Sequence, residues 1–152
     1  MKEELLKRLE SNIDACIEQG YHCSEGTLRA VAEILGLPLS DDILKASSGF
    51  RGGGGGMRER CGCVEAGIIL IGLRYGRLQA TESSAPYSYL IRKLHERFLS
   101  EQGSYTCHDL YPTAKLLHGN CHYYHKNGTM ILGDFMLDAN KMLAEKPSDE
   151  TK

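Results

Sequence analysis

The sequence predicts an all-α fold, a compact helical bundle of about five to seven helices with a glycine-rich loop at a cysteine site. Apolar residues recur at helical spacing, glycine or proline follows most of these stretches, and no segment alternates like a half-buried strand. The 152 residues, 41% of them hydrophobic, suffice for one core. We therefore expect one helical domain over residues 1–146 and a disordered tail over residues 147–152.

Three helices are expected in the first third of the chain. Residues 2–18 carry an apolar stripe that includes Cys16, so this thiol should face the core. A second amphipathic helix is entered at Cys23 and ends before Gly36. Ser40 is a good N-cap for a short third helix, because its side-chain oxygen can accept a hydrogen bond from an unpaired amide.

The middle of the chain contains five consecutive glycines, Gly52 to Gly56, which neither a helix nor a strand tolerates without cost. This stretch is therefore expected to be a loop or a tight turn. A fourth helix should follow over residues 58–75, with the apolar run 66–73 as its most buried part.

The last third begins with a helix that starts near Pro86 and stops at Gly103, since proline suits the first helical position. Two short cysteine-bearing segments come next. A turn is expected at Asn127-Gly128, and a last helix over residues 130–144.

Charge and composition exclude several classes of function. The formal net charge of -2 gives no basic excess, so we expect no nucleic-acid partner. No long apolar run is present and the N-terminal residues are charged, so we expect no membrane partner and a cytoplasmic location. Because thiols stay reduced in that compartment, the six cysteines are more readily ligands, redox groups or core residues than a disulfide framework.

Four cysteine-bearing stretches could carry chemistry, and each falls at or near an expected helix start or a loop. The partial positive charge of a helix N-terminus stabilises thiolate, the form that attacks disulfides and binds metals. Three stretches pair cysteine with histidine, so His22, His108, His122 and His125 are candidate metal ligands or proton donors. The stretches are His22-Cys23, Cys61-Gly62-Cys63, Cys107-His108 and Cys121-His122.

The glycines could form a phosphate-binding loop, or they could let the backbone approach a bound group closely. The first interpretation is disfavoured, because the run lacks the preceding strand and the lysine of a phosphate-binding loop. Instead, Gly53, Gly54, Gly55 and Gly62 would let the backbone pass close to a cluster, a cofactor or a thiol pair.

On a continuous helix Cys61 and Cys63 would point about 200° apart. Both can therefore serve one site only if the chain is not helical at this entry.

The ordered cysteines and glycines resemble the bacterial C_GCAxxG_C_C family of redox-active proteins. The resemblance covers roughly residues 15 to 125. It rests on Cys23, on the run Gly49-Phe50-Arg51-Gly52-Gly53-Gly54, on Cys61-Gly62-Cys63-Val64-Glu65-Ala66-Gly67, on Ile71-Gly72-Leu73-Arg74-Tyr75-Gly76, and on Phe98, Gly103-Ser104, Cys107 and Cys121.

The resemblance implies a helical cytosolic protein with four redox-active cysteines: Cys23, Cys107, Cys121 and one thiol of the Cys-Gly-Cys. The family pattern has an alanine after its glycine and cysteine. If Cys63 occupies the alanine position, the family cysteine is Cys61; if Val64 occupies it, the family cysteine is Cys63. The register against the downstream Gly72-Leu73 favours Cys61 slightly.

Three hypotheses follow. In the first, the protein transfers electrons to a redox partner that the sequence does not identify. The electrons are carried by an iron–sulfur cluster or by dithiol/disulfide cycling, and the residues in either case are Cys23, Cys61, Cys107 and Cys121. Cys63 is then a fifth ligand or a resolving thiol. In the second, three or four of the same thiolates, with His22, His108 or His122 as further candidate ligands, bind a structural zinc ion without redox turnover. In the third, the chain is a helical scaffold with buried cysteines. The sequence leaves a homo-oligomer open.

Overall fold

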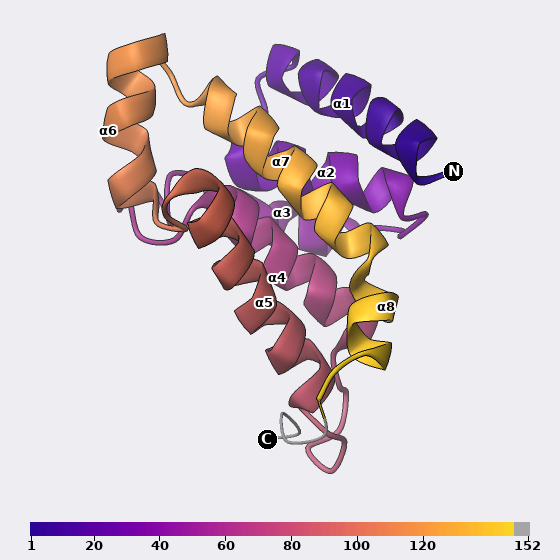
Figure 1. The fold of residues 1–152 in the computed structure, drawn as a ribbon. Coiled ribbons are helices and arrows are strands. Elements are labelled where there is room, and N and C mark those ends of the chain that lie inside the picture. Colours follow the sequence, from indigo (N-terminus) through magenta and orange to yellow (C-terminus); the bar gives the residue numbers. More distant parts are fainter. Residues whose placement is uncertain (148–152) are drawn as a thin grey trace.

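The computed structural model describes residues 1–147, and this part of the chain is all-helical (Figure 1). The all-α prediction is confirmed. The predicted tail lies outside the described residues except for Pro147. The helices are α1 (Lys2–Glu18), α2 (Cys23–Ile34), α3 (Asp41–Ser48), α4 (Gly62–Tyr75), α5 (Ala85–Gln102), α6 (Cys107–His118), α7 (His122–Leu137) and α8 (Ala139–Ala144).

The predicted number of five to seven helices was too low, because the described residues form eight. The segment around Cys107, expected to be short, is a full helix that begins at the N-cap Thr106, whose hydroxyl accepts a hydrogen bond from the amide of Asp109 at 3.3 Å. The last predicted helix is divided at Asp138 into α7 and α8.

The predicted turn at Asn127-Gly128 was also wrong, since α7 continues through it. Gly128 is buried against Cys63 of α4: a Cβ added to Gly128 would lie 3.0 Å from both Cβ and Sγ of Cys63. The glycine therefore allows close helix packing here instead of a turn.

Helix α7 is central to the bundle. It contacts α1, α2, α4, α5 and α6, and in Figure 1 it runs between α1 on one side and α5 on the other. Its buried Leu132, Phe135 and Met136 join apolar side chains from α1, α2, α4 and α5 in one core. Helix α6 lies at the edge of the bundle (Figure 1).

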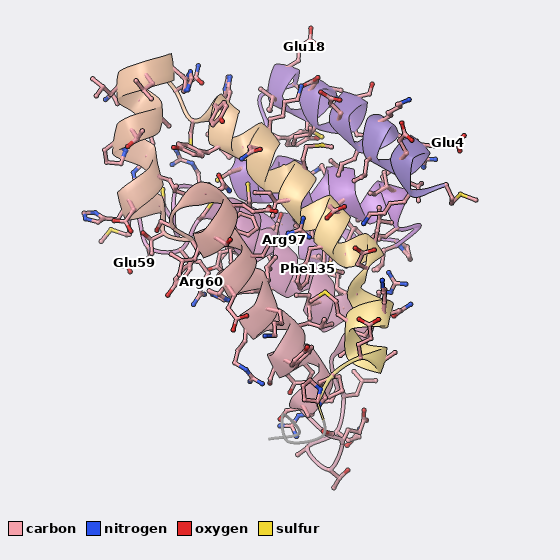
Figure 2. The ribbon with its side chains drawn as sticks, viewed as in Figure 1. Glu4, Glu18, Glu59, Arg60, Arg97 and Phe135 are labelled. Carbon is pink, nitrogen blue, oxygen red and sulfur yellow. The ribbon has the colours of Figure 1, made fainter. Side chains whose placement is uncertain are left out.

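Ion pairs around Asp134 tie three helices together on the surface. Arg97 of α5 donates a hydrogen bond to Asp134 of α7 at 2.5 Å, and Lys2 of α1 lies 2.8 Å from the same carboxylate. Figure 2 shows Arg97 beside α7 and Phe135. Because all three side chains are partly exposed, each pair contributes at most about 1 kcal/mol.

Over residues 1–147, no helix combines the length and the apolar character needed to cross a bilayer. The more polar helices pack by one face only. Helix α1, for example, buries Leu9, Ile13 and Cys16 and exposes its charged residues.

The close packing of α4 predicts contrasting effects for two of its glycines. A Cβ on Gly67 would lie 2.5 Å from Leu94 Cδ2 and 2.7 Å from Leu132 Cδ1, both in fully buried side chains. We expect Gly67→Ala to lower the free energy of unfolding by about 1–3 kcal/mol through overpacking. Urea denaturation measures this change.

Gly72→Ala is the matched control, because Gly72 lies on the same helix, is exposed and has nothing within 4 Å of an added Cβ. Alanine should stabilise this position by up to about 1 kcal/mol through helix propensity. Equal effects of the two substitutions would contradict the packing described here.

Candidate functional site

Four helices begin at cysteines. Cys23 and Cys107 are the first residues of α2 and α6, and Cys61 and Cys121 are the N-caps of α4 and α7. The first amides of a helix have no partner within the helix, so each of these thiols lies at a partially positive helix end.

A short backbone pairing joins two of these helix starts. Arg60 and Thr106 form an isolated antiparallel bridge. Around it, the Cys61 amide donates to Tyr105 O at 2.9 Å, and the Cys107 amide donates to Glu59 O at 2.7 Å. Figure 2 shows Glu59 and Arg60 beside the start of α6. The pairing therefore fixes the N-termini of α4 and α6 relative to each other.

Because of this backbone pairing, the prediction that the fourth helix starts at Arg58 was wrong. Residues 58–61 donate and accept hydrogen bonds across to residues 105–108, and Arg58 has the left-handed φ of 64°. The helix begins only at Gly62. Cys61 and Cys63 therefore do not share a continuous helix.

Three of the cysteines, Cys23, Cys107 and Cys121, line one cavity of about 270 Å³. The other lining residues include two arginines, three histidines and two tyrosines: Arg51, Arg58, His22, His122, His125, Tyr21 and Tyr111, together with Gly52, Gly119 and Asn120. Asp and Glu are absent from this lining.

Cys61 lies behind this cavity and is 7% exposed. The neighbouring thiol of Cys63 is the main cause of the lowered pKa of Cys61, and the backbone amides of Cys63 and Val64 lower it further. This is the only cysteine in residues 1–147 for which a lowered pKa is found. Cys61 is therefore the cysteine best prepared to be a thiolate.

Cys63 supports Cys61 from inside the core. It is fully buried, and its sulfur lies 3.3 Å from Thr27 Oγ1 and 3.6 Å from the carbonyl oxygen of His125. Its interaction with Cys61, together with burial, raises the pKa of Cys63 well above the usual value. Cys63 thus stays protonated and stabilises charge on Cys61.

Cys23 lies directly against the Cys61–Gly62 segment. A Cβ added to Gly62 would be 2.3 Å from Cys23 Sγ and 2.9 Å from the Ser24 amide nitrogen, so only glycine fits there. Burial and the nearby Cys61 raise the pKa of Cys23. Burial, followed by the charges of Cys61, Cys23 and Cys107, raises the pKa of Cys121 to about 12.

Arg58 contacts the thiol of Cys107. Its Nη1 lies 3.5 Å from Cys107 Sγ, and its guanidinium stacks 3.6 Å from the centre of the Tyr111 ring. The contact with Cys107 raises the pKa of Arg58. Sequence reasoning missed Arg58 and Tyr111, although an arginine just after a glycine run was a usable signal.

The glycine run contributes in only one place to the cavity wall, at Gly52. Gly53 is buried against the backbone of Arg58 and Glu59, where an added Cβ would lie 2.3 Å from the Glu59 amide nitrogen. Gly54 and Gly55 have nothing within 4 Å of an added Cβ. The role predicted for these glycines toward a cofactor stays a prediction.

The histidines divide into two sets. His22, His122 and His125 line the cavity, whereas His108 is exposed outside it, next to Asp109. Burial lowers the pKa of His125 to about 4. In the described part of the chain, no three His, Cys, Asp or Glu side chains are arranged to hold a metal ion. The iron–sulfur and zinc sites suggested by the sequence therefore stay predictions.

Cys16 is separate from this site. It is buried on α1, as its place on the apolar stripe predicts, and burial raises the pKa of its thiol. Its surroundings are Gly26 and Arg29 of α2 rather than the cavity. Cys16 is therefore a natural internal control for the other thiols.

A family model described as "Putative redox-active protein (C_GCAxxG_C_C)" matches residues 21–145. No curated protein and no solved structure matches the chain significantly. The matched residues include all five thiols at or behind the cavity and leave out Cys16.

The contact between Cys61 and Cys63 predicts how the acidity of Cys61 responds to substitution. In Cys63→Ala the thiol that lowers the pKa of Cys61 is absent, so this pKa should rise and the thiolate fraction at neutral pH should fall. The ultraviolet absorbance of thiolate, titrated against pH, measures it. Subtracting the titration of a Cys61→Ser version isolates Cys61.

Cys16→Ala is the control for this titration, and it should leave the Cys61 titration unchanged. A pKa of Cys61 that stays the same or falls in Cys63→Ala would show that the neighbouring thiol does not stabilise the thiolate.

A second prediction concerns the glycine run. Gly53 and Gly54 both have positive φ, of 76° and 88°, so alanine is strained at either position. Only at Gly53 would the new Cβ also meet backbone. We expect Gly53→Ala to reduce the free energy of unfolding by about 1–3 kcal/mol more than Gly54→Ala. Chemical denaturation compares them, and equal losses would argue against the packing of Gly53 on residues 58–59.

Proposed function

The chain belongs to the C_GCAxxG_C_C family of redox-active proteins, and from this premise we propose that it transfers two electrons by cycling Cys23 and Cys61 between a dithiol and a disulfide. One observation carries the proposal: the thiol with a lowered pKa, Cys61, belongs to a segment that lies directly against the sulfur of Cys23.

The two thiols have complementary properties. Cys61 supplies the thiolate, while Cys23 lines the cavity and is reached from solvent. Oxidation joins the two sulfurs and releases two electrons and the proton of Cys23. Reduction reverses this: two electrons break the sulfur–sulfur bond and Cys23 takes up a proton. All six cysteines are free in the structure, which corresponds to the reduced form.

Cys63 is less suited to be the partner of Cys61. It is fully buried and its pKa is raised, so it acts as a donor to the Cys61 thiolate. Cys107 and Cys121 line the same cavity as Cys23, where they can exchange with a disulfide formed there. In this proposal Cys61 is the family cysteine of the Cys-Gly-Cys.

The proposal predicts which thiols disappear together on oxidation. The reduced protein is equilibrated in glutathione buffers of graded potential, quenched with acid, alkylated and weighed by mass spectrometry. The wild type and Cys16→Ser should lose two alkylatable thiols in one step, and peptide mapping should identify a Cys23–Cys61 disulfide. Cys23→Ser and Cys61→Ser should lose this step.

The result that overturns the proposal is two-thiol oxidation that persists in both Cys23→Ser and Cys61→Ser. Anaerobic purification with iron, sulfide and zinc analysis belongs to the same experiment. Stoichiometric iron and sulfide, or zinc, would replace dithiol cycling by the cluster or by the structural zinc ion that the sequence also suggested.

A further inference from the structure

We infer that the cavity selects a negatively charged substrate, and that the oxidant accepted by its thiols is a small disulfide bearing carboxylate groups. This inference rests on the proposed function and adds the substrate class. It starts from the charges around the cavity rather than from the cysteines.

The charged residues of the wall all have one sign. Arg51 and Arg58 carry permanent positive charge, and neither Asp nor Glu contributes to the lining. The chain as a whole has a formal net charge of -2, so this local excess of positive charge is not a general property of the surface. A cavity lined by one sign of charge concentrates ions of the opposite sign.

Helix ends add to the positive potential. The N-termini of α2, α6 and α7 open onto the cavity through Cys23, Cys107 and the Cys121–His122 pair, and each helix has at least 12 residues. The dipole of each helix places partial positive charge at this end, although the first amides of α6 already donate to Glu59 O, Arg58 O and Thr106 Oγ1.

The size of the cavity and its thiols decide the class of ligand. About 270 Å³ accommodates a small organic molecule. The thiols need an oxidant, and a disulfide reacts with thiolate without any further reactant. One cysteine thiolate attacks a substrate sulfur, breaks the substrate's sulfur–sulfur bond and releases one substrate thiolate. A second cysteine thiolate attacks the mixed disulfide, forms the protein disulfide and releases the other.

Three disulfides that differ only in end groups test the inference. 3,3′-Dithiodipropionate is anionic, bis(2-hydroxyethyl) disulfide is neutral and cystamine is cationic. Each rate of oxidation of the reduced protein is divided by the rate of an uncharged free dithiol with the same disulfide. We expect the normalised rate of the anion to exceed that of the cation by roughly tenfold or more at low salt. About 1 M salt should remove most of this preference.

Substitution of Arg51 locates the effect. Arg51 is exposed at the cavity, whereas Arg58 contacts Cys107 and is left intact. Arg51→Gln should lower the normalised rate for the anion by a larger factor than that for the neutral disulfide. Arg92→Gln, which removes an equal charge from the exposed face of α5, should change neither.

A redox-inactive ligand separates binding from electron transfer. Suberate has the shape of dithiodipropionate with two methylenes in place of the sulfurs, and calorimetry should detect its binding to the wild type and weaker binding to Arg51→Gln. Equal normalised rates for all three disulfides, or no binding of suberate, would overturn the inference. If suberate binds but no disulfide oxidises the protein, the proposed function fails while the anion site stands.

Discussion

The site depends on a backbone pairing of only a few residues. Segments 58–61 and 105–108 are distant in sequence, yet hydrogen bonds of 2.7–2.9 Å join them around the bridge of Arg60 and Thr106. A helix cannot continue through residues whose amides and carbonyls are engaged in this way, so α4 and α6 both begin here. The positive ends of two helices, each with a cysteine, are thereby held next to each other. Apart from this pairing, α6 packs mainly against α7.

A second constraint acts on charge within the cluster. Thiolates repel one another in a poorly solvated environment, so neighbouring cysteines do not all ionise together. The structure reflects this: the pKa of Cys61 is lowered while the pKa values of Cys23, Cys63 and Cys121 are raised. One negative charge is thus favoured, and the other thiols keep their protons. Such a distribution suits two-electron thiol chemistry, in which one sulfur attacks and another releases a proton.

Local patterns predicted most of the helices, since apolar spacing, Ser40 and Pro86 act over a few residues. The errors arose where distant contacts decide. The start of α4 was misplaced because residues 58–61 pair with residues 105–108, and Gly128 was read as a turn although it packs against Cys63. The sequence also identified Cys23, Cys107 and Cys121, which line the cavity, because the order and spacing of cysteines can be read from the sequence alone. It did not predict the arginine contact with Cys107 or the lowered pKa of buried His125, since both depend on three-dimensional surroundings.

The wide separation of the cysteines along the chain has a consequence for biosynthesis. Cys23, Cys61, Cys107 and Cys121 come from four segments, and the wall of the cavity closes only when α7 is in place. A nascent chain on the ribosome therefore cannot complete the cavity until the segment with Cys121 has emerged. The groups that lower the pKa of Cys61 belong to Cys63 and Val64 and emerge much earlier, so the wall that surrounds the nucleophile is assembled after the nucleophile itself.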